Sequence, residues 1–283
     1  VGAHYIDLAD GRRFVCDFPA ALDADFRAAG RTAISGASTV PALSSAVVEQ
    51  LTRGWRSIHR ISTCIAPAQT APRGTATLEA VLGYCGAEVR VWQKGQWQLR
   101  RGWAAPERVQ FARMVPRLGA LCDIPDLEIF PAHFGVRDEV LFRAALEIAL
   151  AQRAFSALAA MRAAGVLRRP EKLARLLNVA ATWLNRLGSS RMGMVVRVEG
   201  EGDTGQHLRG EWHIAADDDH GPEIPCMASI LLARHLARGE ALAAGAQVCM
   251  GLLTLEDFLP EFSKWGMETD VLVEAAGHGA PAV

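Results

Sequence analysis

The stretch AHYIDL (residues 3–8) predicts a buried β-strand near the beginning of the chain. Leu22, Phe26 and Ala29 recur at helical spacing after it, and TAIS (residues 32–35) predicts a second strand. A strand, a helix and another strand joined by short loops indicate a parallel sheet. Two strands form too small a sheet to stand alone, so we expect its other strands upstream of Val1 or in a partner.

The rest of the chain predicts both strands and helices. Strand patterns cover residues 57–65, 89–99 and 194–215, and the last two ranges are predicted hairpins. Helical patterns cover residues 39–54, 75–84, 137–164, 170–187 and 222–239. Residues 246–274 mix strand and short helix. Within 170–187 a recurring set of apolar side chains predicts a buried stripe, formed by Leu173, Leu176, Leu177, Ala180, Leu184 and Leu187.

The composition is that of an ordinary soluble globular protein. Half of the 283 residues are apolar, 22% are charged, and the net charge of −1 gives no general attraction to nucleic acid or to an anionic membrane. The six cysteines are scattered without a CxxC pair, which is typical of free thiols in a reducing cytoplasm. The start of the chain is too polar for a signal peptide, and residues 140–166 are too charged to span a bilayer. We therefore expect a cytoplasmic protein.

Two motifs resemble ligand sites but favour other interpretations. Residues 200–205 (GEGDTG) match the dinucleotide-binding pattern, yet Glu201 and Asp203 would repel a pyrophosphate, and a strand pattern follows where a helix is required. We predict a hairpin loop there. Residues 213–220 contain two histidines and three consecutive aspartates without the alternating spacing of a hard-cation loop, so no metal site is predicted.

Residues 140–192 carry nine Lys or Arg side chains, and their only acids are Glu147 and Glu171. Such a basic helical region can contact phosphate or a membrane surface. The alternative is that the arginine stems pack along an amphipathic helix pair while their charged ends stay in water. The basic residues are spread around the helices, which favours the second interpretation and makes membrane contact the less favoured one.

A candidate ligand site follows the second strand, in Ser35-Gly36-Ala37-Ser38-Thr39-Val40-Pro41. This segment joins the carboxyl end of a parallel strand to the beginning of a helix, where open α/β sheets bind ligands. Small hydroxyl side chains there can contact a ligand, and the helix end favours negative charge. The alternative is an ordinary helix cap by Ser38 or Thr39.

Five segments taken together resemble the saccharopine-dehydrogenase-like NAD(P) oxidoreductases, a broad family of bacterial proteins. Their order and spacing carry the resemblance over nearly the whole chain, at residues 2–12, 36–45, 72–77, 188–194 and 221–225. The resemblance implies that the chain is a truncated, C-terminal portion of such a protein, with the glycine fingerprint for NAD(P) upstream. We therefore expect NAD(P) in the full-length protein, no cofactor bound to this fragment, and no activity of the fragment alone.

The resemblance also implies a fold class, α/β plus α+β. The last strands of a Rossmann domain would be followed by a mixed-sheet α+β domain with a helical insertion. The implied division is residues 1–55 for the Rossmann remnant, 56–135 and 191–283 for the two parts of the substrate and dimerisation domain, and 136–190 for the insertion. A homodimer is a further expectation from the family.

Residue by residue, the resemblance places a candidate site at the junction of the two domains. The implied roles are catalytic for Asp7 and Asp10, substrate-binding for Ser38, Thr39 and Arg73, and cofactor-binding for Arg12, Gly36 and Pro41. Asp10 or Asp7 would hold a protonated nitrogen. Arg73 would hold an anionic group, and the alternative is a surface arginine beside the helix predicted from Thr75. The chain has Thr39-Val40-Pro41-Ala42 where saccharopine reductases have Asp-Pro-Gly, which argues against saccharopine as the substrate.

Two functions remain open. The first is hydride transfer between NAD(P)H and a small substrate, across a C=N or C=C bond. In such reactions the cofactor supplies the chemistry, so few catalytic motifs are required of the protein. The second is a non-catalytic dimerisation or membrane-surface module that has kept the fold.

Overall fold

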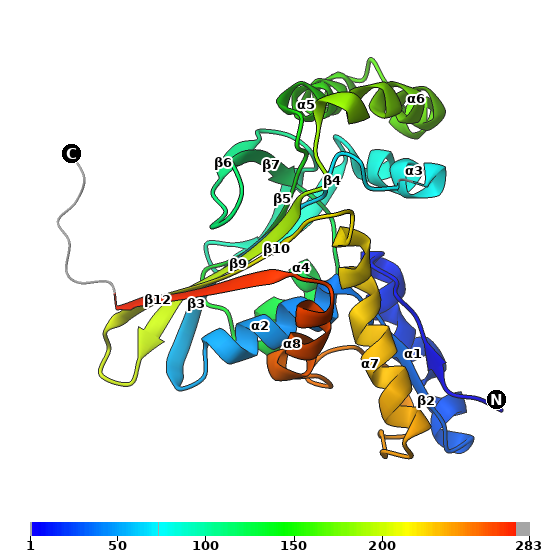
Figure 1. Ribbon diagram of the computed structural model, residues 1–283, viewed down its shortest axis with the longest axis vertical. Coiled ribbons are helices and arrows are strands. Elements are labelled where there is room, and N and C mark those ends of the chain that lie inside the picture. The colour runs from blue at the N-terminus through cyan, green and yellow to red at the C-terminus, as the bar shows by residue number, and fades with distance from the viewer. Residues whose placement is uncertain (1, 73, 276–283) are drawn as a thin grey trace.

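Two β-sheets organise the part of the chain that the computed structural model describes, residues 2–72 and 74–275 (Figure 1). The smaller sheet has three parallel strands, in the order β1 (Tyr5–Ile6), β2 (Thr32–Ser35) and β11 (Gly245–Val248). The larger sheet has nine strands within the described residues. Seven of them lie side by side in the order β12 (Glu268–Ala275), β10 (His207–Ala216), β9 (Met192–Gly202), β3 (Trp55–Ala66), β8 (Glu139–Ala145), β4 (Glu88–Gln93) and β5 (Gln96–Arg101). The other two branch from β8: β7 (Arg117–Leu121) pairs with β8, and β6 (Glu107–Val109) pairs with β7. Its β3 and β8 are parallel, and its other pairs are antiparallel.

The small sheet combines the beginning of the chain with a late segment. Helix α1 (Arg12–Ala28) connects β1 to β2, which confirms the predicted order of strand, helix and parallel strand. Strand β1 is shorter than predicted and is not buried, since Tyr5 is 40% exposed and Ile6 is half-buried at the edge of the sheet. Strand β11 lies beside β2, with Ala246 opposite Ala33. The expected division places residues 245–248 with the second domain, whereas in the structure they pair with β2 in the small sheet. The physical reason is an apolar cluster in which Ala33 and Ala246 pack against the α1 side of the sheet.

The large sheet is covered on one face by helices and is partly open on the other. Helices α2 (Ser44–Leu51), α4 (Asp126–His133) and α8 (Leu255–Lys264) pack beneath it (Figure 1). Strand β9 shows how the sequence selects the faces, because its side chains alternate. Val196 and Val198 lie in the main core, whereas Arg197 and Glu199 form ion pairs on the open face.

Three helices lie together at one end of the large sheet, at the top of Figure 1: α3 (Thr75–Tyr84), α5 (Ala149–Ala163) and α6 (Ala174–Leu184), with short turns at Pro170–Leu173 and Asn185–Leu187. The helix predicted over residues 137–164 begins only at Ala149, because residues 139–145 form β8. The side chains of Val140, Leu141 and Phe142 are all buried, and the β8 backbone pairs with neighbouring strands on both sides. A continuous apolar run of this kind does not distinguish a buried strand from a buried helix.

The chain returns to the small sheet after β10. A turn at Gly221–Glu223 leads into α7 (Ile224–Ala237), which packs against β1 and against the helical turn η1 (Thr39–Leu43) that follows β2. Both predicted hairpins are confirmed, as β4–β5 and β9–β10. Residues 200–202 end strand β9, and residues 203–205 lie in the turn that leads to β10. The glycine-rich motif therefore belongs to a hairpin and is followed by a strand, as predicted.

Candidate functional site

The carboxyl ends of β1 and β2 meet in a hydrogen-bonded turn. Oδ1 of Asp7 accepts hydrogen bonds from the Ala9 N–H at 2.9 Å, the Ser35 hydroxyl at 3.0 Å and the Gly36 N–H at 3.0 Å. The Asp7 carbonyl accepts another from the Ala37 N–H at 2.8 Å. Oδ2 of Asp7 is buried and has no hydrogen-bond partner within the described residues. The Asp7 carboxylate therefore fixes the shape of this turn.

Two side chains closely approach the backbone of Gly36 in this turn. Its φ is +78°, and a Cβ there would lie 2.8 Å from Cδ of Pro41 and 3.2 Å from Cγ1 of Val15. Gly36 and Pro41 thus pack directly on each other at the edge of the small sheet.

We expect Gly36→Ala to lower the free energy of unfolding by about 2 kcal/mol or more, because it combines left-handed strain with a steric clash. Gly30→Ala is the matched control, since Gly30 has φ +59° and open space around its Cα. Urea unfolding measures the free energy of unfolding of both variants. Gly30→Ala reports the left-handed strain alone, so any larger loss in Gly36→Ala measures the steric clash. Equal losses in the two variants would contradict the clash at Gly36.

Ser38 and Thr39 follow Gly36 and are buried, with exposed fractions of 7% and 5%. Ser38 is the residue before η1, but its side chain makes no capping hydrogen bond. Its carbonyl accepts the Leu43 N–H at 3.3 Å, and its own N–H donates to the Gly36 carbonyl at 2.8 Å. The hydroxyl groups are therefore not used as helix caps, in contrast to the alternative interpretation of this segment.

Arg12, at the start of α1, ties the small sheet to the rest of the molecule. Its guanidinium donates to Asp123 at 2.9 Å and to the Arg90 carbonyl at 2.7 Å, and it pairs with Glu128. The Arg12 side chain is only 9% exposed. Its positive charge is thus compensated by two carboxylates within the protein.

Asp10 lies in the loop between β1 and α1 and keeps an exposed edge. The surrounding protein displaces water from its carboxylate, which raises the pKa of Asp10. Burial also raises the pKa of Tyr84, which lies at the end of α3. Two neighbours raise this pKa further: the Cys122 thiol, to which Tyr84 is hydrogen-bonded, and the Asp10 carboxylate. The half-buried Tyr84 therefore lies within electrostatic range of Asp10, which the sequence did not reveal.

The predicted site residues fall into two neighbouring groups. Asp7, Gly36 and Pro41 form one turn, with Ser38 and Thr39 next to them, whereas Asp10 and Arg12 lie in and after the β1–α1 loop. Arg73 lies outside the described residues.

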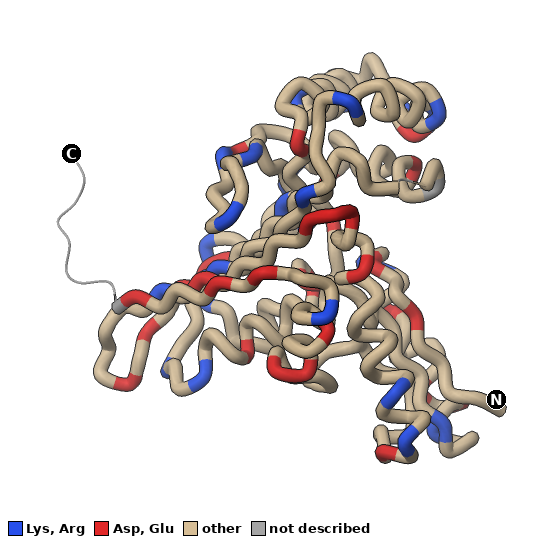
Figure 2. The backbone as a smooth tube through the Cα atoms, viewed as in Figure 1, with Lys and Arg blue, Asp and Glu red and all other residues tan. Residues whose placement is uncertain are grey.

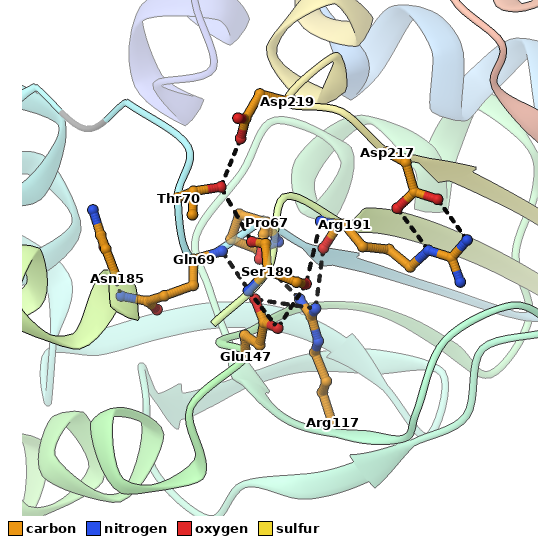
Figure 3. A network of polar contacts seen from close by, with 10 residues as sticks. All are labelled: Pro67, Gln69, Thr70, Arg117, Glu147, Asn185, Ser189, Arg191, Asp217 and Asp219. Atoms are coloured by element: carbon orange, nitrogen blue, oxygen red, sulfur yellow. Dashed lines mark hydrogen bonds and ion pairs between the residues drawn. The ribbon is translucent and has the colours of Figure 1, made fainter. Parts of the chain in front are cut away.

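A polar network that the sequence did not predict lies at the carboxyl ends of β3 and β8 (Figure 3). Arg117 is 5% exposed and donates to the Pro67 carbonyl at 2.8 Å and to the Arg191 carbonyl at 3.1 Å. It lies 3.5 Å from Glu147, which accepts hydrogen bonds from the Gln69 N–H and from Ser189. A lone arginine opening an apolar strand carries no recognisable motif, so no sequence signal marked it.

The network borders an open groove of about 520 Å³. The cations at its rim are compensated: Arg191 pairs with Asp217, and Arg113 pairs with Glu268 and Asp270. The hydrogen bond from Arg191 holds the pKa of Asp217 below its usual range. The groove therefore has no excess of positive charge.

The acidic run considered above as a metal site is engaged in the same network. Asp217 binds Arg191, Asp219 accepts a hydrogen bond from the Thr70 hydroxyl at 2.6 Å, and Nδ1 of His220 lies 3.1 Å from the Trp265 carbonyl. In residues 2–72 and 74–275 no three His, Cys, Asp or Glu side chains are grouped so that they could hold a metal ion. Over the same residues, no helix is both long and apolar enough to cross a membrane.

Comparison with known proteins places this geometry in a known fold. No protein-family model and no curated protein matches the chain. Among solved structures, the chain is similar to apo saccharopine dehydrogenase (L-glutamate-forming) from Saccharomyces cerevisiae, with a TM-score of 0.59 and 10% sequence identity over 89% of this chain and 76% of that chain. The chain thus has a saccharopine-dehydrogenase-like fold of mixed α/β type, with one parallel sheet and one mostly antiparallel sheet, as the sequence resemblance predicted.

Proposed function

We propose that this chain belongs to an NAD(P)-dependent oxidoreductase that transfers hydride to or from a small substrate, and that it supplies the substrate-facing part. The fold likeness to saccharopine dehydrogenase over 89% of the chain carries this proposal. The turn at the carboxyl ends of β1 and β2 supports it, because ligands of open α/β sheets bind at such edges. In this proposal residues 1–55 are the end of a Rossmann domain, and a homodimer and a cytoplasmic location remain predictions.

A nicotinamide dinucleotide needs donors for its pyrophosphate, and the described turns at this edge do not fit that group. Asp7 and Asp10 put negative charge beside the start of α1, where a phosphate would require N–H donors. The N–H groups of Gly36, Ala37 and Ser38 are already bonded within the turn. The proposal therefore assigns the cofactor phosphates to residues outside these two turns.

Asp10 is the carboxylate proposed to meet the substrate. It keeps solvent access, and Arg12 in the next turn is already engaged by Asp123 and Glu128, so Asp10 is free to hold a protonated nitrogen. Asp7 acts as a positioning residue, because three donors engage one of its oxygens. An Asp10→Ala enzyme with unchanged turnover would remove the first of these assignments.

The test is NADPH and NADH binding by calorimetry, on this 283-residue chain and on any longer natural product of its gene. We expect the longer protein to bind one of the two cofactors and this chain to bind neither, because the pyrophosphate donors are missing from the described turns. Binding by this chain alone would overturn the expectation that these 283 residues do not hold the cofactor. Absence of binding in both proteins would overturn the oxidoreductase proposal itself.

A further inference from the structure

Helix α6 exposes a continuous apolar stripe to solvent. Leu176, Val179, Trp183 and Leu187 recur every three or four residues and so lie on one face of the helix and of the turn that extends it. Their exposed fractions lie between 59% and 76%. Single exposed apolar side chains are common, whereas four in a row along one helix mark a contact surface. The stripe predicted to be buried is thus divided, because Leu176 and Leu187 point outward.

The opposite side of α6 already supplies the packing that the fold requires. Ala174 lies opposite the stripe and is buried in the main core, Leu173 and Leu177 pack against that core beside it, and α6 contacts α3. A helix that is apolar on two opposite sides is typical of one buried on both. Within the described residues nothing covers the outer stripe, and the helix lies at the end of the molecule opposite the small sheet (Figure 1).

The charges around the stripe are strongly one-sided. Residues 149–187 carry seven Lys or Arg and a single acid, Glu171, in a chain whose net charge is −1 (Figure 2). None of these seven cations forms an ion pair with a carboxylate within the described part of the chain. Arg175 and Arg186 each precede a stripe residue by one position, so both lie along the same flank of the stripe.

We propose that the outer face of α6 docks on an anionic lipid surface. The stripe would enter the boundary between headgroups and acyl chains, with Trp183 at the interfacial depth that tryptophan prefers. The flanking arginines would meet the lipid phosphates while their stems lie along the apolar surface. This inference is independent of the hydride-transfer proposal.

The charge pattern selects this occupant over a second copy of the chain. Two copies meeting through α6 would bring two strongly basic faces together, which electrostatic repulsion opposes. The stripe itself is a convex row of side chains without hydrogen-bonding groups other than the Trp183 indole. A lipid surface needs only apolar insertion and opposite charge, without the shape complementarity that a protein partner requires.

The test is co-sedimentation of the whole chain with phosphatidylcholine vesicles, with and without about 30% phosphatidylserine. The informative variant is W183S/L187S, and the control is V271S/L272S, which removes two exposed apolar side chains from the edge strand β12. We expect binding to the anionic vesicles only, weakened at least fivefold when salt rises to about 0.5 M. The W183S/L187S variant should lose about tenfold or more in affinity, and the control should bind like the unchanged chain.

Three outcomes would overturn the proposal. The first is no binding to anionic vesicles at low salt. The second is equal loss of binding in both variants, which would show nonspecific adsorption. The third is self-association in sedimentation velocity that W183S/L187S abolishes while vesicles are not bound, which would identify a second copy as the occupant. Circular dichroism of both variants verifies that these surface changes leave the fold intact.

Discussion

Replacing Asp126 by asparagine is expected to raise stability above neutral pH and to leave it nearly unchanged in acid. Asp126 lies at the start of α4 with an exposed fraction of 2%, and its Oδ2 accepts a 2.7 Å hydrogen bond from Ser44 of α2. Its Oδ1 is buried without a partner among the described residues. Burial raises the pKa of Asp126 to about 7, although the hydrogen bond from Ser44 opposes the rise.

The sign follows from the difference between the folded and unfolded pKa values. The folded protein holds the Asp126 proton more tightly, so the stability linked to this group is fully present below about pH 4 and is lost as pH rises through about 7. A shift of about three units corresponds to a loss on the order of 4 kcal/mol. The asparagine variant has no charge to bury and should escape this loss.

Urea unfolding at about pH 4 and about pH 8 measures the effect, with the midpoint and the slope recorded at each pH. Asp203→Asn is the control, because Asp203 is exposed at the β9–β10 hairpin tip. Asp126→Asn should gain relative to the unchanged protein only at the higher pH. If the free energy of unfolding changed with pH in the same way in Asp126→Asn and in the unchanged protein, Asp126 would not be a buried acid with a raised pKa.

The sequence predicted local structure well where one short pattern determined it. The β4–β5 hairpin was visible because alternating residues flank Lys94-Gly95, and both turn residues have positive φ. Strand β8 was missed because its apolar run is buried on both faces and has no strand period. Strand β11 pairs with β2 across more than two hundred residues, as Ala246 with Ala33, and no local pattern carries such a register.

The burial of side chains and the geometry of the site were harder to predict than the helices and strands. The leucine spacing in α6 correctly identified an apolar helix, but periodicity cannot tell whether a second apolar side has a neighbour, and Leu176 and Leu187 are exposed. The turn after β2 was located from the rule for parallel sheets, whereas the role of Asp7 in shaping it depends on contacts between two strands. Arg117 and Glu147 are distant in the sequence and are brought together only by the fold, so their pairing could not be predicted from the sequence.

Arg117→Met is expected to lower the free energy of unfolding by about 3–5 kcal/mol, the usual cost of removing one partner of a buried ion pair. The guanidinium connects the ends of three segments through the Pro67 carbonyl, the Arg191 carbonyl and the Glu147 carboxylate. Methionine preserves most of the apolar volume but leaves both carbonyls without this donor. Desolvation lowers the pKa of Arg117, and proximity to Glu147 opposes that change.

A double-mutant cycle with Glu147→Gln separates the ion pair from the carbonyl contacts. Glu147 also accepts hydrogen bonds from the Gln69 N–H and the Ser189 N–H, both at 3.0 Å, so Glu147→Gln alone should cost about 1–3 kcal/mol. If the two charges compensate each other, the double variant should lose less than the sum of the single losses, by about 1 kcal/mol or more. Arg100→Met is the control, because Arg100 is exposed and bonds only to Gln93 and Gln98 within the described residues. A loss at Arg117 no larger than at Arg100 would mean that the buried network does not hold the ends of β3 and β8 together.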